Sequence, residues 1–298
     1  MGPGVAELFM AVCRAEVMAL KPGNVHVHAA GHGMTVADFL LSADVAAPEI
    51  ARPGAAVGER ILRAVRATRA AVNCNTNLGI LLLTAPLARA AEMPPSRPLH
   101  DRVCAVLEEL SVEDAEAAFE AIRLASPGGL GRAAEHDVAG PATVDLRTAM
   151  AAAQSRDRIA AQYADGYRDV FGIGVARARA LTGKDVGKDA VSMAEAVYLE
   201  FLTAFPDSHV LRKQGEAVAA GLMAEAQEVR RQLAAVSSDA VRHDHLFAFD
   251  ARLKWQGINP GTSADLTVAS LFAHCLEDRD RTGGGRETPS GRVAWACA

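Results

Sequence analysis

Apolar residues recur along this chain at the three- and four-residue spacing of helices, and we find no run in which they alternate with polar residues as in a half-buried strand. In the first segment Val5, Leu8 and Val12 fall on one helical face, and Pro22-Gly23 stops the helix. No hairpin dipeptide joins two alternating runs, and no repeat of fixed period occurs. The pattern predicts an all-α fold, a single multi-helix bundle domain with functional loops between the helices.

Helix-capping patterns in the sequence indicate where two helices begin. Thr35-x-x-Asp38 and Ser111-x-x-Asp114 are capping-box patterns, in which each side chain accepts a hydrogen bond from the other residue's backbone. From Asp278 onward the stretch DRDRTGGGRETPSGR is polar and glycine-rich. We therefore predict a helical transferase domain over residues 1–277 and a disordered polar tail over 278–298. Further helical patterns cover residues 78–91, 143–171, 190–204, 214–235, 240–254 and 264–277.

Charge and composition exclude several classes of protein. The net charge is -5 without a long basic run, which argues against a nucleic-acid surface. No apolar stretch approaches the roughly 20 residues of a membrane span, and the N-terminus lacks the basic start of a secretion signal. The 5 cysteines are scattered and form no C-x-x-C, as expected of reduced thiols. We expect a cytoplasmic protein that binds neither nucleic acid nor membrane. Whether it forms a homo-oligomer is left open.

Polar, glycine-bearing loops recur where helices end or begin. A helix N-terminus preceded by glycine presents free N–H groups and a partial positive charge, which suits phosphate. Neither the P-loop spacing nor G-x-G-x-x-G is present. Ordinary capping explains any one of these loops, whereas several together predict a pocket for a polyanion. The loops are LKPGNVH (20–26), NCNTNLG (73–79), SPGGLGRAAEHD (126–137), FPDSHVLRKQG (205–215) and INPGTSADL (258–266).

Two groups of residues are candidate metal ligands. His26, His28 and His32 lie close together, but HVHAAGH contains no cysteine or carboxylate, and zinc usually takes ligands from rigid elements. We regard this cluster as the weaker hypothesis and leave its metal binding open. Mg²⁺ bound with phosphates needs only one or two carboxylates plus waters. The stronger candidates lie on distant loops, where each could otherwise cap a helix or pair with arginine: Asp157, Asp207 and Asp265.

The ordered segments KPGNV, GHGM…DFLLSA, NTNLG, RDRIA, PDSHVLRKQG and NPGTSADL resemble the triphosphoribosyl-dephospho-CoA synthase family over residues 16–276. The resemblance implies an all-helical transferase that joins the triphosphorylated ribose C1 of ATP to the 2′-hydroxyl of 3′-dephospho-CoA and expels adenine. ATP is then a substrate, and Mg²⁺ is the expected cofactor. Two nucleotides would bring many phosphates to one site, in keeping with the predicted polyanion pocket.

Two loops depart from the family's pattern. Its K-P-G-L-V-D reads KPGNVH (21–26) here, and its G-V-N-T-H-K-G ends here in NTNLG (75–79), without the histidine and lysine. Loss of a lysine from a phosphate-binding loop should weaken or redirect the binding of one substrate. The identity of the acceptor is therefore open. One alternative is phosphoribosyl transfer in pterin or one-carbon cofactor biosynthesis, from ATP or phosphoribosyl pyrophosphate. Another is a nucleotide-binding helical module without catalysis.

Cleavage of the C1′–N9 bond of ATP needs a site that stabilises an oxocarbenium-like centre, protonates adenine and deprotonates an acceptor hydroxyl. The resemblance and the loop chemistry together nominate Asp157, Asp207 and His209 as catalytic residues, with His209 as the candidate acid. Asp265 joins the two aspartates as a metal ligand or as a cap with Thr262. Substrate or phosphate binding is expected of Lys21, Gly23, Asn24, Asn75, Thr76, Asn77, Arg212, Lys213, Asn259, Gly261 and Thr262.

Overall fold

The computed structural model describes residues 3–29, 31, 33–182 and 190–283. Within these ranges the regular secondary structure is helical, and no β-sheet forms beyond two isolated bridges in the stretch 26–34. This confirms the predicted all-α class. No helix in the described part of the chain is both long and apolar enough to cross a membrane.

The helices follow one another with short connections. The first six are α1 (Val5–Met18), α2 (Val36–Ile50), α3 (Val57–Val72), α4 (Leu78–Ala90), α5 (Leu99–Glu108) and α6 (Val112–Ala125). The middle of the chain contains α7 (Leu146–Ala151), α8 (Arg158–Asp165), the π-helical segment η1 (Val170–Val175) and α9 (Ala176–Leu181). The last five are α10 (Ala190–Ala204), α11 (Ser208–Gln214), α12 (Glu216–Ala234), α13 (Asp239–Trp255) and α14 (Gly261–Gly283).

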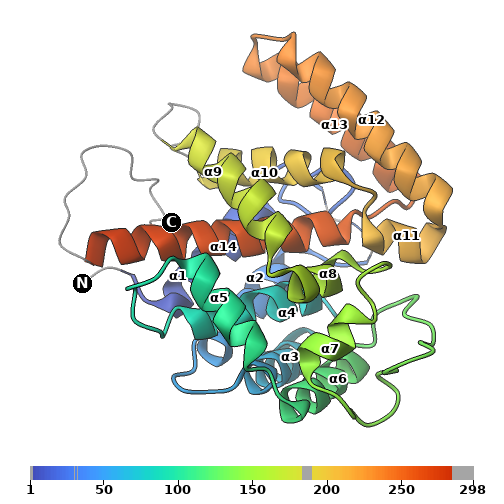
Figure 1. Ribbon diagram of the computed structural model, residues 1–298. Coiled ribbons are helices and arrows are strands. Elements are labelled where there is room, and N and C mark those ends of the chain that lie inside the picture. The colour runs from blue at the N-terminus through green and yellow to red at the C-terminus, as the bar shows by residue number, and fades with distance from the viewer. Residues whose placement is uncertain (1–2, 30, 32, 183–189, 284–298) are drawn as a thin grey trace.

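Helix α14 is the central element of the fold (Figure 1) and packs against α1, α4, α10 and η1. Between residues 262 and 276 it is buried on most of its circumference, as expected for a helix surrounded by others. Leu266, Leu271 and Phe272 are fully buried on it, and the Phe272 ring meets the edge of Phe9 of α1 at 6.0 Å between centroids. Helices α12 and α13 instead form a hairpin that projects from the main body, and its base packs in a second, smaller apolar cluster shared with α10 and α11.

Two predicted caps are confirmed. Thr35 and Ser111 accept hydrogen bonds from the backbone of Asp38 and Asp114, and both reciprocal bonds of the capping box are present. The helical pattern over 143–171 is not one helix, because a turn over 152–157 separates α7 from α8. Gly166 then ends α8 with a left-handed φ of 71°.

Two other predictions are wrong. The segment FPDSHVLRKQG is not a loop throughout, since its central residues form α11. The boundary at residue 277 lies too early, because α14 continues to Gly283 and its last turns are anchored to the main body. The buried Arg102 of α5 forms an ion pair with Asp280, and Arg279 donates to the Ala91 carbonyl at 3.0 Å. The remainder of the predicted tail, 284–298, lies outside the described residues.

The packing of η1 on α14 gives a first prediction. A Cβ on Gly174 would collide with the Ser270 side chain, whereas a Cβ on Gly172, two residues earlier, would meet nothing within 4 Å. We expect Gly174→Ala to lower the free energy of unfolding by about 1–3 kcal/mol through overpacking. Gly172→Ala is the matched control and should leave stability unchanged or slightly higher. Equal effects of the two substitutions in urea unfolding would contradict this packing.

Candidate active site

A cavity of about 560 Å³ opens between α4, α8, α11, α14 and the loop 126–138. Its volume lies within the roughly 300–1,000 Å³ typical of small-molecule sites. Four helices begin at its wall, near Leu78, Ile159, His209 and Gly261. Because each helix N-terminus carries a partial positive charge, their convergence favours an anionic ligand.

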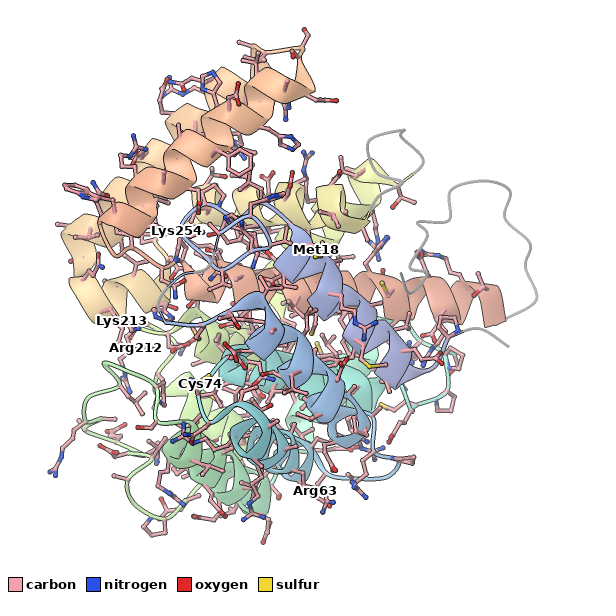
Figure 2. The ribbon with its side chains drawn as sticks, turned by 180° about the vertical axis from the view of Figure 1, so that it is seen from behind. Met18, Arg63, Cys74, Arg212, Lys213 and Lys254 are labelled. Carbon is pink, nitrogen blue, oxygen red and sulfur yellow. The ribbon has the colours of Figure 1, made fainter. Side chains whose placement is uncertain are left out.

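Most of the predicted site residues meet at this cavity although they come from distant loops. Those that line it are Asn24, Asn75, Thr76, Asn77, Asp157, His209, Arg212, Lys213, Asn259, Gly261, Thr262 and Asp265. Figure 2 shows Arg212 and Lys213 close together on α11, on the same side of the molecule as Cys74, which precedes NTNLG. Three predicted residues are not part of the wall: Lys21, Gly23 and Asp207.

Lys21 lies beneath the cavity and not in it. Its side chain is fully buried, forms an ion pair with Glu16 and donates to Asn24 Oδ1 at 3.1 Å. Asn24 in turn donates to Asn259 Oδ1 at 2.9 Å. Lys21 therefore holds Asn24 and neutralises Glu16, in place of the predicted direct contact with phosphate. Glu16 itself lines the cavity. The sequence analysis does not select Glu16, because α1 also contains the charged residues Glu7 and Arg14 and nothing local distinguishes the three.

Gly23 does not offer its N–H to phosphate as predicted, because it donates to Asp250 Oδ1 at 2.9 Å. Asp250 of α13 also lies 3.2 Å from His26 Nε2 and 3.1 Å from Lys254 Nζ. Burial lowers the pKa of His26, while hydrogen bonding to Asp250 opposes that shift. This network fastens the stretch KPGNVH to α13. Of the histidine cluster, His32 lies outside the described residues.

Asp207 caps α11 and joins it to α14. Its side chain is 1% exposed. Oδ1 accepts from the N–H of His209 at 2.9 Å and of Val210 at 3.1 Å, and Oδ2 accepts from the N–H and hydroxyl of Ser263, both at 2.8 Å. Burial raises the pKa of Asp207, and the four hydrogen bonds oppose the shift. With both oxygens so engaged, this geometry favours a structural role over the predicted catalytic or metal role.

Asp157 caps α8 and faces the cavity. Its Oδ1 accepts from the N–H of Ile159 at 2.8 Å and of Ala160 at 3.2 Å, and its Oδ2 lies 3.4 Å from Arg212 Nη1. The Asp157 carboxylate therefore accepts hydrogen bonds from the first N–H groups of α8 with one oxygen and presents the other oxygen to Arg212. Arg212 also donates to the Gly128 carbonyl at 3.3 Å, which ties the loop 126–138 to the same wall.

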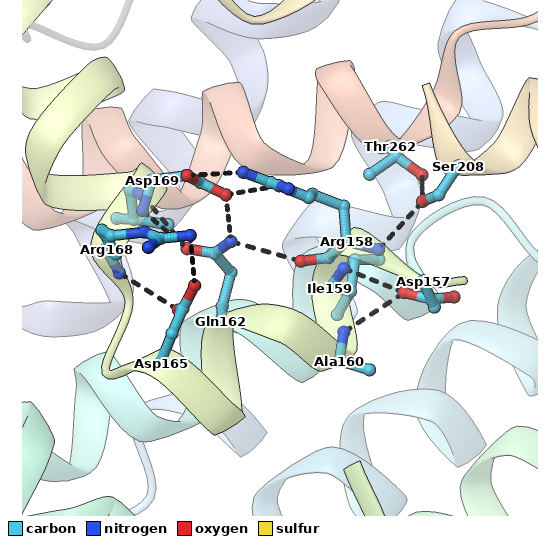
Figure 3. Close-up of polar contacts among 11 residues, drawn as sticks. Asp157, Arg158, Ile159, Ala160, Gln162, Asp165, Arg168, Asp169, Ser208 and Thr262 are labelled. Atoms are coloured by element: carbon cyan, nitrogen blue, oxygen red, sulfur yellow. Dashed lines mark hydrogen bonds and ion pairs between the residues drawn. The ribbon is translucent and has the colours of Figure 1, made fainter. Parts of the chain in front are cut away.

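A short chain of hydrogen bonds connects three helix starts (Figure 3). The N–H of Arg158 donates to Ser208 Oγ at 3.1 Å, and Ser208 Oγ lies 2.9 Å from Thr262 Oγ1. Thr262 also accepts from the N–H of His209 at 3.1 Å. Thr262 is thus not the predicted cap of its own helix. Its hydroxyl instead links α14 to α11.

The asparagines of NTNLG shape the start of α4. Asn75 Oδ1 accepts from the N–H of Leu78 at 3.1 Å, and Asn77 Nδ2 donates to Thr68 Oγ1 at 3.1 Å. Thr76 donates to Ser42 Oγ at 2.6 Å. These bonds hold the turn rigidly at the cavity wall.

Asp265 projects into the space that Gly79 leaves by having no side chain, and a Cβ on Gly79 would collide with the Asp265 carboxylate. Burial raises the pKa of Asp265 well above its ordinary value. The carboxylates of Glu16, Asp207 and Asp157 raise it further, and Arg212 opposes them. A cation would relieve this crowding of like charges, so the donor set at Asp265 and Asp157 fits Mg²⁺.

No three Asp, Glu, His or Cys side chains in the described part of the chain lie close enough together to hold a metal ion. The predicted triad of Asp157, Asp207 and Asp265 is therefore not preassembled, because Asp207 is committed to the bond between α11 and α14. A cation here would need oxygen ligands from a bound substrate in addition to protein carboxylates.

The buried cap at Asp207 gives a second prediction. Asp207→Ala leaves several buried donors without an acceptor, and we expect it to lower the free energy of unfolding by about 3 kcal/mol. Asp145→Ala is the matched control, because Asp145 caps α7 through Thr148 but joins no second helix, and should cost about 1 kcal/mol. Chemical unfolding followed by circular dichroism measures both. Equal losses would show that the bridge to α14 contributes nothing.

Comparison with known proteins agrees with the fold. A solved structure from Archaeoglobus fulgidus, named as a candidate triphosphoribosyl-dephospho-CoA synthase, is similar to this chain with a TM-score of 0.61 and 23% sequence identity. The similarity covers 80% of this chain and 98% of that one, and at this identity it shows a shared fold. Among curated proteins, none matches this chain.

The family comparison goes further than the fold. The model of the CitG family, described as ATP:dephospho-CoA triphosphoribosyl transferase, matches residues 3–283, which include all the cavity-lining residues. With a match over nearly the whole chain, and with the family's polar loops gathered at one cavity, this protein belongs to the CitG family of transferase enzymes.

Proposed function

We propose that this protein transfers the triphosphoribosyl group of ATP to an acceptor hydroxyl, the 2′-hydroxyl of 3′-dephospho-CoA, and releases adenine. The observation that carries the proposal is the meeting of cations, helix N-termini and carboxylates at one cavity. In the reaction the C1′–N9 bond breaks and a bond from C1′ to the acceptor oxygen forms. The acceptor hydroxyl loses its proton, and adenine gains one as it leaves.

The cationic side of the cavity would bind the triphosphate. Arg212 and Lys213 lie in adjacent positions of α11, and Arg212 is 21% exposed as a side chain. A guanidinium can hold two phosphate oxygens at once, whereas the lysine contributes a point charge. A triphosphate would draw Arg212 away from Asp157, whose 3.4 Å contact is long for an ion pair. That exchange would leave the Asp157 carboxylate available beside the ribose.

The carboxylate side would stabilise the positive charge that develops at C1′ when the glycosidic bond breaks. Asp265 and Glu16 both line the cavity, and Glu16 carries its own counter-ion in Lys21. Asp157 is our candidate base for the acceptor hydroxyl, and His209 is our candidate acid for adenine. Gly261 allows the His209 ring to lie against the start of α14, since a Cβ there would be 2.5 Å from Nδ1.

Asp265 would hold Mg²⁺ together with the substrate phosphates, because one carboxylate suffices for this ion and Asp157 Oδ2 is left to act as the base. When bound, the ion supplies charge neutralisation for the polyphosphate. The residues of this chain would then keep the triphosphate and the carboxylates in one cavity without mutual repulsion.

The activity has a direct test. Incubation with ATP, Mg²⁺ and 3′-dephospho-CoA should release free adenine, measured by liquid chromatography. We expect Arg212→Ala to lower kcat/KM for ATP by about 10- to 100-fold through loss of a forked phosphate contact. Arg231→Ala on the exposed face of α12 is the matched control and should have no effect.

Adenine released with a pterin or ribitol acceptor, and not with dephospho-CoA, would redirect the proposal to that acceptor. ATP binding without adenine from any acceptor would contradict transferase activity.

The charge crowding at Asp265 gives a fourth prediction. Because the pKa of Asp265 is raised in the folded protein, folding favours its protonated form. The contribution of protonated Asp265 to the free energy of unfolding is fully present below the pKa of about 3.9 that an aspartate has in the unfolded chain. It is lost as the pH rises through the raised pKa of the folded protein. Asp265→Asn stays neutral, so without divalent cations it should be more stable than wild type at pH 8 and no more stable at pH 4.

The same substitution should lower adenine release by at least about 100-fold. Loss of activity together with a gain in stability separates a functional carboxylate from a structural one. A variant that is less stable at pH 8, or fully active, would contradict this role of Asp265.

A further inference from the structure

The cavity has a second, apolar part in addition to its charged wall. Six side chains line this apolar recess, and they come from α4, α6, α7 and α8: Leu82, Phe119, Ile122, Ala149, Met150 and Ile159. In Figure 1, α6 and α7 lie on the opposite side of α8 from α11 and α14. The apolar recess and the cations of α11 therefore lie on different sides of α8, and the segment 126–131, which follows α6, reaches Arg212 through Gly128.

The apolar side chains of the recess are mostly covered by neighbouring protein atoms. Phe119 is 3% exposed, Leu82 is 6% exposed and Met150 is 9% exposed, so each presents a small apolar patch to the cavity. An apolar ligand surface that displaces water from such patches binds favourably. The charged wall is suited to bind a polyanion, and the recess is suited to bind a flat or apolar group. A single ligand that occupies both parts must carry the polyanion at one end and the apolar group at the other.

We infer that the apolar recess binds the heteroaromatic base of a nucleotide whose phosphates lie at Arg212 and Lys213. In a nucleotide the ribose joins the base to the phosphates. When the base lies in the recess and the phosphates lie at α11, the ribose lies between them. Asp157 occupies this part of the cavity. The assignment rests on the proposed function, because it locates the base within the site of the proposed reaction.

The segment that follows α6 favours a nucleotide over a plain hydrocarbon chain. This glycine-rich segment, 126–131, lines the cavity between the end of α6 and α11, where Gly128 accepts a hydrogen bond from Arg212. Within the described residues, the backbone N–H groups of 128–132 donate to no acceptor of the protein. Residues 128–132 are exposed, so their N–H groups can donate to polar atoms of a nucleotide that spans the recess and α11. A hydrocarbon chain would leave them unused.

Filling the recess tests this inference by binding alone. Ala149 on α7 is 8% exposed and lines the recess, so Ala149→Phe should occupy the space of the base. Ala151→Phe is the matched control, since Ala151 lies on the same helix but not at the cavity. The probes are ATP, 3′-dephospho-CoA and inorganic tripolyphosphate, each titrated by calorimetry with Mg²⁺. We expect Ala149→Phe to raise the Kd of at least one nucleotide tenfold or more, with the Kd of tripolyphosphate unchanged.

The outcomes are distinct. Weakened ATP binding assigns the recess to the base of the donor, and weakened dephospho-CoA binding assigns it to the base of the acceptor. Unchanged Kd values for both nucleotides would overturn the inference, and so would an equal loss of tripolyphosphate binding. Circular dichroism checks that the variant folds, and Ala153→Leu, which also lines the cavity, replaces it if it does not. Nucleotide binding that follows this pattern without adenine release would contradict the transferase proposal and leave the recess assignment intact.

Discussion

The arrangement of the site depends on the buried carboxylate of Asp207. Four hydrogen bonds join its two oxygens to the first turn of α11 and to Ser263 of α14, so two helices that are distant in the sequence begin at one point. The Ser208 and Thr262 hydroxyls extend this connection to the start of α8. Because these helices are fixed by their first turns, the side chains that follow each cap reach the cavity at defined positions. A carboxylate without access to the substrate thus determines where the functional groups lie.

The charges around the cavity are only partly balanced within the protein. Glu16 is neutralised by Lys21 beneath the wall, and Asp157 lies beside Arg212. Asp265 has no ion pair of its own among the described residues, and the surrounding carboxylates raise its pKa. An incoming triphosphate can bind the cations of α11, while a cation or a developing positive charge on the ribose can be stabilised by Asp265. The imbalance therefore favours a ligand that carries both signs of charge, as a nucleotide with its metal ion does.

The sequence was a good guide to the helices and to the loops of the site, because helical periodicity and caps such as Thr35 are local signals. It was a poor guide to features that depend on tertiary neighbours. Helix α11 has 7 residues, too few to show a helical period, so the sequence pattern predicts a loop there. An aspartate before a helix looks the same whether it faces a cavity, as Asp157 does, or a second helix, as Asp207 does. Glu16 is one of three charged residues of α1, with Glu7 and Arg14, and only the packing of α1 against α14 brings it to the cavity.

A crystal structure with ATP and Mg²⁺ bound, in the absence of acceptor, tests the central claim most directly. We predict the triphosphate in contact with Arg212 and Lys213 in the last turn of α11, and the ribose C1′ facing the carboxylates of Asp265 and Asp157. A nucleotide bound outside this cavity, or bound with its phosphates remote from α11, would contradict it.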